Sequence, residues 1–136
     1  MVTFTVTYDG ALRCSAVHGP SGATLLTDAP KDNHGRGESF SPTDLIATSL
    51  ATCVLTTMAI LTRNDGLALD GIRAEVEKHM TSTPPRRIAR IVVRLAMPRG
   101  IPVSDREKLH QIAHACPVAL SLHPDIAQEI SLAYPD

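Results

Sequence analysis

The feature that most constrains this chain is a stretch of 18 consecutive residues without a charged side chain, Leu45 to Thr62. Its length reaches the minimum for a membrane span. Six of its residues are serine or threonine, however, and Asp44 and Arg63 bound it closely, which favours the buried helix of a soluble protein with no membrane partner. Apolar residues occupy nearly every face of this helix, so it must be buried on all sides. A chain of 136 residues can hardly surround it alone, and we expect a dimer.

The residues at the two ends of this stretch predict where the helix begins and ends. Ser41 suits the N-cap and Pro42 suits the first helical position. Asp44 falls in the first turn, where the helix dipole favours an anion. The run Asn64-Asp65-Gly66 predicts the end of the helix at about Arg63.

The other segments predict an α+β fold, because strands precede and follow this helix. Before it we expect three strands and a polar loop, with the turn Asp9-Gly10 joining the first two strands: 3–8, 12–17, 23–27 and the loop 28–41. After it we expect two strands, a helix capped by Ser104, a further helical turn and a closing strand: 72–80, 90–97, 104–115, 117–122 and 130–134. The two strands after the helix each carry one apolar and one largely charged face, which is typical of an antiparallel sheet covered on one side. No linker or repeat is evident, so residues 1–136 are predicted to form a single domain.

Charge and cysteine content narrow the classes of function. Thirteen basic and 14 acidic residues leave a net charge of −1, so no basic face is implied and nucleic acid is not expected as a partner. The N-terminus, MVTFTVTYDG, lacks the basic segment and apolar run of a signal peptide. We therefore expect a cytoplasmic, reducing location. There the three cysteines are free or catalytic rather than structural: Cys14, Cys53 and Cys116.

The cysteines, taken one by one, leave several interpretations open. Cys53 lies in the middle of the apolar helix, where a cysteine commonly acts as a small core residue. Cys116 lies near a helix end, where local charges shift a thiol pKa. The chain has no CxxC motif. The separation of 63 positions between Cys53 and Cys116 neither supports nor excludes a disulfide between them.

Histidines offer an alternative interpretation as a metal site. His110 and His114 are four residues apart on one helical face, and Cys116 follows closely. Imidazole and thiolate groups are common ligands of transition metals. No third ligand or second motif accompanies them, and surface histidines are the commoner case, so no metal or cofactor is expected.

Two segments together resemble a known family. The segment from Gly37 to Cys53, GESFSPTDLIATSLATC, resembles the first cysteine motif of the OsmC/Ohr family, named for osmotically induced protein C and the organic hydroperoxide resistance proteins. In that family a Pro-led apolar helix carries a peroxide-attacking cysteine eleven residues after the proline, and Pro42 to Cys53 has this spacing. The segment Cys116-Pro117-Val118-Ala119 resembles the second motif, which supplies the partner thiol.

This resemblance implies both a fold and an activity. The fold implied is an intertwined α+β homodimer with antiparallel sheets wrapped around two long central helices. The activity implied is a thiol-dependent peroxidase that acts on organic hydroperoxides. Cys53 would become a sulfenic acid, Cys116 would resolve it to a disulfide, and a dithiol, typically a protein-bound lipoyl group, would reduce the pair again.

The first motif departs from the peroxidase branch of the family, which has Asn-Pro-Glu where this chain has Ser41-Pro42-Thr43, and this places the chain closer to the OsmC-like branch. In the peroxidase branch the glutamate holds an arginine near the thiolate, and in this chain Thr43 stands at that position. The nearest replacements are Asp44 and Glu38 for the carboxylate and Arg13 for the cation. If Cys53 lacks this activation, the chain would instead sense oxidants or bind an apolar ligand with little turnover.

Overall fold

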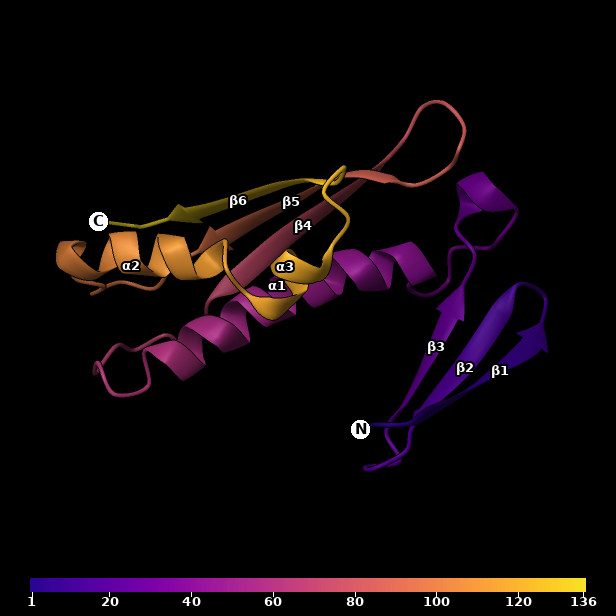
Figure 1. The fold of residues 1–136 in the computed structure, drawn as a ribbon, viewed down its shortest axis with the longest axis horizontal. Coiled ribbons are helices and arrows are strands. Elements are labelled where there is room, and N and C mark those ends of the chain that lie inside the picture. Colours follow the sequence, from indigo (N-terminus) through magenta and orange to yellow (C-terminus); the bar gives the residue numbers. More distant parts are fainter. The chain divides into compact units, whose positions relative to one another are not determined.

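Six strands, three α-helices and one short 3-10 helix follow one another in the computed structural model, which describes residues 1–136 (Figure 1). They are β1 (Phe4–Gly10), β2 (Arg13–His18), β3 (Thr24–Asp28), η1 (Lys31–Asn33), α1 (Pro42–Leu61), β4 (Arg73–Met80), β5 (Ile88–Ala96), α2 (Val103–Ala113), α3 (Pro117–Ser121) and β6 (Ala127–Ala133). The predicted α+β class is confirmed. Internal contacts divide the chain into two units, Met1–Ile46 and Ala47–Asp136. The single-domain assignment of residues 1–136 stays a prediction.

The N-terminal unit holds an antiparallel sheet in the order β1-β2-β3. The predicted hairpin between the first two strands is confirmed, but its turn lies further along the chain. Gly10 pairs with Arg13, and the two residues between them, Ala11 and Leu12, have φ angles of 52° and 63°. A two-residue hairpin loop of this kind needs positive φ at both central positions. The Asp9-Gly10 signal was therefore right about the hairpin and wrong about which residues reverse the chain.

The polar loop after β3 is ordered by backbone contacts. The Asp28 N–H donates to the carbonyl of Phe40 (3.1 Å), which joins the two ends of the loop. Gly35 packs against Ala29 so closely that any side chain at this position would collide with the Ala29 carbonyl. The loop also contains η1, a single 3-10 turn that the sequence did not predict.

The long helix α1 begins where it was predicted to begin. The Ser41 Oγ accepts from the Asp44 N–H (3.1 Å), and the Asp44 carboxylate accepts from the Ser41 N–H (2.8 Å), which forms a reciprocal cap. The helix ends at Leu61, slightly before the expected Arg63. It is long and apolar enough to cross a membrane by length and composition, a test that core helices of soluble proteins also pass.

In the second unit the sheet order is β4-β5-β6. Strands β4 and β5 form the predicted antiparallel hairpin. Strand β6 pairs with β5 in parallel, with Val93 opposite Ile130, so the expectation of purely antiparallel sheets is wrong. The physical reason is the crossover: α2 and α3 carry the chain back to the end of the sheet where β5 began, which makes the next strand parallel.

Helix α2 buries one stripe of residues, Leu109, Ile112 and Ala113. Its start differs from the prediction. The N-cap is Pro102, which makes no side-chain cap hydrogen bond, and Ser104 is the second helical residue. A proline at the boundary presets an extended entry into a helix, and the serine signal two residues later was misleading.

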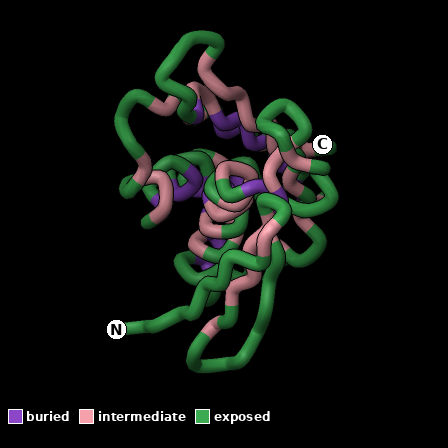
Figure 2. The backbone as a smooth tube through the Cα atoms, turned by 90° about the vertical axis from the view of Figure 1, so that its right-hand side faces the viewer, coloured by how far each residue is buried: buried purple, intermediate pink, exposed green.

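The core lies between the helices and one face of the β4-β5-β6 sheet. One buried cluster is formed by inward-facing residues of α1, β5 and α2. It includes Leu50, Val54, Ile91, Val93 and Leu109. The N-terminal unit contributes none: its only buried residues are Asp28 and Ser41. In Figure 2 the strand that starts at the N label is coloured almost entirely green, for exposed. The first sheet therefore has apolar side chains but no buried apolar core of its own.

Candidate active site

Cys53 and Cys116 meet in the second unit, although 63 positions separate them in the sequence. Cys53 lies on α1 at the border between its buried and exposed faces. Cys116 is the N-cap of α3, where its Sγ accepts from the Ala119 N–H (3.4 Å). The two side chains are close enough for each to act on the pKa of the other. Both thiols are free, so the structure represents the reduced pair.

The surroundings of Cys53 favour its thiolate. Burial would raise the pKa of the thiol, but hydrogen bonds from the Val118 backbone N–H, the Cys116 side chain and the Thr57 hydroxyl outweigh it, so the pKa is lowered from its ordinary value. The Thr57 Oγ1 lies 3.8 Å from the Cys53 Sγ. These three donors come from α1 and the start of α3, all within the second unit.

The surroundings of Cys116 have the opposite effect. Its pKa is raised, first because the side chain is completely buried, and further because the neighbouring Cys53 takes the negative charge. The backbone N–H groups of Ala119 and Val118 only partly offset this. The surroundings of the two thiols therefore act in opposite directions, and Cys53 loses its proton more readily than Cys116.

The predicted helper charge, Arg13, lies in the N-terminal unit with two carboxylates. One guanidinium nitrogen lies 2.6 Å from the Glu38 carboxylate and 3.5 Å from Asp28. Glu38, followed by Asp28, raises the pKa of Arg13. Of the two carboxylates proposed for this role, Glu38 makes the ion pair, whereas Asp44 completes the helix cap with Ser41.

Asp28 is a partner that the sequence did not reveal. Its side chain is 1% exposed, and its Oδ2 accepts from the Glu38 N–H (3.0 Å). Its Oδ1 is buried without a hydrogen-bond partner. Asp28 faces Arg13 because the two pair across β2 and β3. That register follows from sheet formation and is not visible in a single strand.

Cys14, the third cysteine, belongs to the N-terminal unit. Together with His18 it lines a hollow of about 510 Å³ in the N-terminal unit, whose walls are mainly apolar and include Phe4, Val6 and Leu45. Cys14 and His18 are four residues apart on β2, and both border this hollow. The His18 Nδ1 is hydrogen-bonded to the Ser21 hydroxyl (2.6 Å).

The histidine pair on α2 forms a ring contact. The imidazole centroids of His110 and His114 are 4.6 Å apart, and the His114 Nδ1 is hydrogen-bonded to the His110 carbonyl oxygen (2.9 Å). Cys116 is buried and neighbours Cys53 instead. No group of three His, Cys, Asp or Glu side chains is arranged to hold a metal ion.

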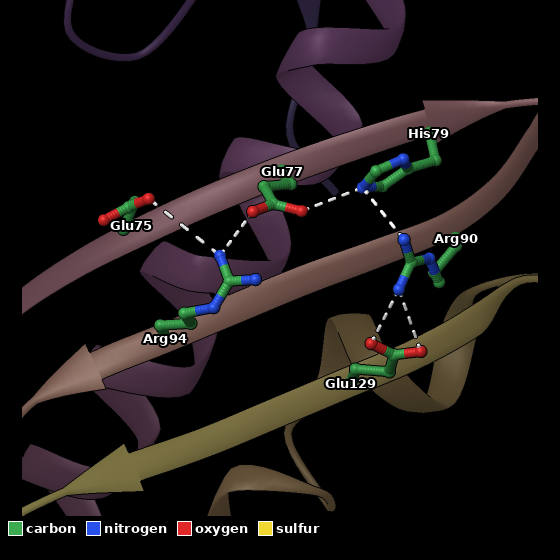
Figure 3. A network of polar contacts seen from close by, with 6 residues as sticks. All are labelled: Glu75, Glu77, His79, Arg90, Arg94 and Glu129. Carbon is green, nitrogen blue, oxygen red and sulfur yellow. Dashed lines mark hydrogen bonds and ion pairs between the residues drawn. The ribbon is translucent and has the colours of Figure 1, made fainter.

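A separate polar network covers the face of the β4-β5-β6 sheet that points away from the helices (Figure 3). Its six members are Glu75, Glu77, His79, Arg90, Arg94 and Glu129. Hydrogen bonds from Arg94 and then His79 hold the pKa of Glu77 at about 2. Val92 lies opposite both Glu77 and Glu129 in the register and is 5% exposed. The charged side chains thus shield an apolar residue on the outer face, and the network does not belong to the thiol site.

Comparison with known proteins agrees with this arrangement. The profile described as OsmC-like protein matches residues 35–131, which include both Cys53 and Cys116. A crystal structure from Psychrobacter arcticus, provisionally described as an osmotic stress induced and detoxification response protein, is 43% identical, with a TM-score of 0.92, and the match covers 98% of this chain and 96% of the other. Among curated protein sequences, none matches this chain significantly.

More distant structures share the fold. An organic hydroperoxide resistance protein OsmC from Legionella pneumophila is 16% identical with a TM-score of 0.76, and one from Elizabethkingia anophelis is 13% identical with a TM-score of 0.77. Each match covers 98% of this chain and 96% of the other. The matching profile over residues 35–131 and the 43% identical structure show that the chain belongs to the OsmC-like family.

Proposed function

We propose that this protein is a thiol-dependent peroxidase that reduces organic hydroperoxides in the cytoplasm. The observation that carries the proposal is the Cys53–Cys116 pair, in which one thiol has a lowered pKa and the other a raised one. A thiolate is the nucleophile in peroxide reduction, and a protonated neighbour is suited to a later step. Two family members of known structure are named as organic hydroperoxide resistance proteins, which supports the same substrate class.

The proposed reaction has three steps. The Cys53 thiolate attacks the outer oxygen of the hydroperoxide, the O–O bond breaks, and the alcohol leaves after taking a proton, so that Cys53 becomes a sulfenic acid. Cys116, giving up its proton, then attacks the Cys53 sulfur, and the hydroxyl leaves as water with formation of a disulfide. A dithiol, of which a lipoyl protein is the candidate source, finally exchanges with the disulfide and restores both thiols.

Counting thiols tests this function directly. One equivalent of cumene hydroperoxide is expected to remove two of the three free thiols per chain quickly, because attack and resolution each consume one. The alternative is an oxidant sensor or a protein that binds an apolar ligand, which Thr43 in the first motif and the apolar hollow in the N-terminal unit favour. A passive binder would lose no thiol under the same conditions, and that result would overturn the peroxidase proposal.

We further propose that Arg13 stabilises the Cys53 thiolate, with Glu38 or Asp44 orienting the guanidinium. The ion pair of Arg13 with Glu38 supports Glu38 in the orienting role. A permanently charged guanidinium has five donors to share between a carboxylate and a thiolate.

The Arg13→Ala variant is expected to raise the Cys53 pKa, because the thiolate would lose its proposed cationic partner. The rate of peroxide reduction would then reach its plateau at higher pH than in the wild type and fall at neutral pH. Thiolate absorbance followed against pH measures the shift. Lys31→Ala, in the exposed loop, serves as the matched loss of one positive charge. An unchanged Cys53 pKa in Arg13→Ala would remove Arg13 from the mechanism.

We also propose that two chains form an intertwined homodimer around their α1 helices. The N-terminal unit buries no apolar residue, and its large apolar side chains Phe4 and Val6 of β1 are 61% and 65% exposed. On α1, Ile60 and Leu61 are 58% and 54% exposed. Apolar patches of this kind mark interaction surfaces, and a three-stranded sheet needs a covered face for stability.

Sedimentation at micromolar concentration is expected to show a dimer. Val6→Asp should shift the protein to monomer, because the charge would enter the proposed interface. Thr5→Asp is the matched control, since Thr5 is the preceding, exposed residue of the same strand and faces the other side of the sheet. A wild-type monomer would count strongly against the proposed dimer.

A further inference from the structure

The disulfide formed by Cys53 and Cys116 would present its two sulfur atoms very unequally to an incoming thiol. Cys116 is completely buried and belongs to the apolar core cluster with Ile112 and Ala113 of α2. Cys53 is partly exposed, and its neighbours Thr52 and Thr56 on α1 are both exposed. We propose, resting on the proposed function, that the reducing thiol attacks the disulfide at the Cys53 Sγ and releases Cys116 first.

The geometry of exchange makes this difference decisive. A thiolate attacks one sulfur of a disulfide and expels the other, so it approaches the attacked atom from the side opposite the leaving sulfur. To attack Cys116 it would have to arrive from within the core. To attack Cys53 it needs only the opening through which the hydroperoxide itself reaches this sulfur. The peroxidase reaction therefore already requires the approach that the reductant would use.

Leaving-group chemistry favours the opposite outcome. The thiol with the lower pKa is the better leaving group, so the lowered pKa of Cys53 and the raised pKa of Cys116 would favour attack on Cys116. The difference in leaving-group pKa changes the rate of thiol–disulfide exchange only by a limited factor. Exposing a core sulfur requires local opening of the protein, and the most protected core segments open only as rarely as the whole fold. Access therefore outweighs leaving-group quality.

The complete exchange balances as follows. One thiolate of a dithiol bonds to the Cys53 Sγ, the Cys53–Cys116 bond breaks, and Cys116 leaves as a thiolate and takes a proton. The second thiol of the reductant then attacks the mixed disulfide at its own first sulfur. Cys53 is released as the thiolate that its surroundings favour, and the reductant leaves as a cyclic disulfide. Cys53 is thus the attachment point for both the oxidant and the reductant.

The test traps the first mixed disulfide with a monothiol that cannot close a ring. The protein carries Cys14→Ser so that only two thiols remain, and diamide oxidises the pair, which makes the disulfide independent of peroxide turnover. Glutathione is added briefly, acid stops the exchange, and N-ethylmaleimide under denaturing conditions marks the freed thiol. Peptide mapping then reads which cysteine carries glutathione.

We expect glutathione on Cys53 and maleimide on Cys116, in excess over the reverse pattern by about tenfold or more at the earliest times. Glutathione on Cys116, or equal amounts on both cysteines, would overturn the inference, because it would show that the disulfide state opens the core around Cys116. Failure of diamide to join the two cysteines would overturn it as well. If diamide forms the disulfide but a hydroperoxide does not, the proposed function fails while the assignment of the attacked sulfur stands.

Discussion

Replacing Cys53 by serine is expected to abolish peroxide turnover while the fold stays intact. A serine hydroxyl is not ionised at neutral pH and is a far weaker nucleophile than the thiolate that the Val118 N–H and the Thr57 hydroxyl favour. We expect the second-order rate constant with an organic hydroperoxide to fall by about a thousandfold or more, as when the nucleophile of a covalent mechanism is removed. Circular dichroism and thermal unfolding check the fold, and stopped-flow mixing measures the rate.

Cys14→Ser is the matched control for this variant, because it removes a thiol without touching the proposed pair. It lies in the N-terminal unit beside the apolar hollow, and it should behave as the wild type. If Cys53→Ser kept its activity while Cys14→Ser or Cys116→Ser lost it, the assignment of the attacking thiol would be wrong.

Replacing Cys116 by serine is expected to leave the first reduction of peroxide intact and to block the second. Without a resolving thiol, the Cys53 sulfenic acid meets further peroxide and is oxidised to sulfinic and sulfonic acids, which dithiols do not ordinarily reverse. Intact-mass measurement should therefore show gains of one, two or three oxygens at Cys53 as peroxide is added. In the presence of a dithiol, each chain of the Cys116→Ser variant should reduce about one equivalent of peroxide and then stop.

The wild type provides the comparison for this experiment. Peptide mapping after one equivalent of peroxide should find Cys53 linked to Cys116 within one chain, with Cα atoms at roughly 4.4–6.8 Å in the oxidised form. Pro117 supplies no backbone N–H and begins α3 after α2 has ended at Ala113, and this break between the two helices would let the Cys116 segment adjust. A disulfide from Cys53 to Cys14, or continued turnover with no disulfide, would defeat the two-cysteine mechanism.

The parts of this structure that sequence alone could predict depend on near neighbours along the chain. The cap of α1 involves Ser41 and Asp44, which are three residues apart, so the start of the helix could be predicted from the sequence. The alternation of apolar and charged residues in β4 and β5 predicted their pairing and the outer charged face for the same reason. Where a local signal misled, as at Asp9-Gly10 and Ser104, a neighbouring residue fulfilled the same role instead.

Only the tertiary structure decided the features that join distant segments. The parallel pairing of β6, the salt bridge of Asp28 with Arg13 and the contact of Cys53 with Cys116 all depend on how the chain returns after a turn or crossover. The opposite shifts of the two thiol pKa values follow from burial and from the N–H groups at the start of α3. Sequence spacing carries no information on burial or on contacts made across 63 positions, because packing of the whole core determines which side chains meet.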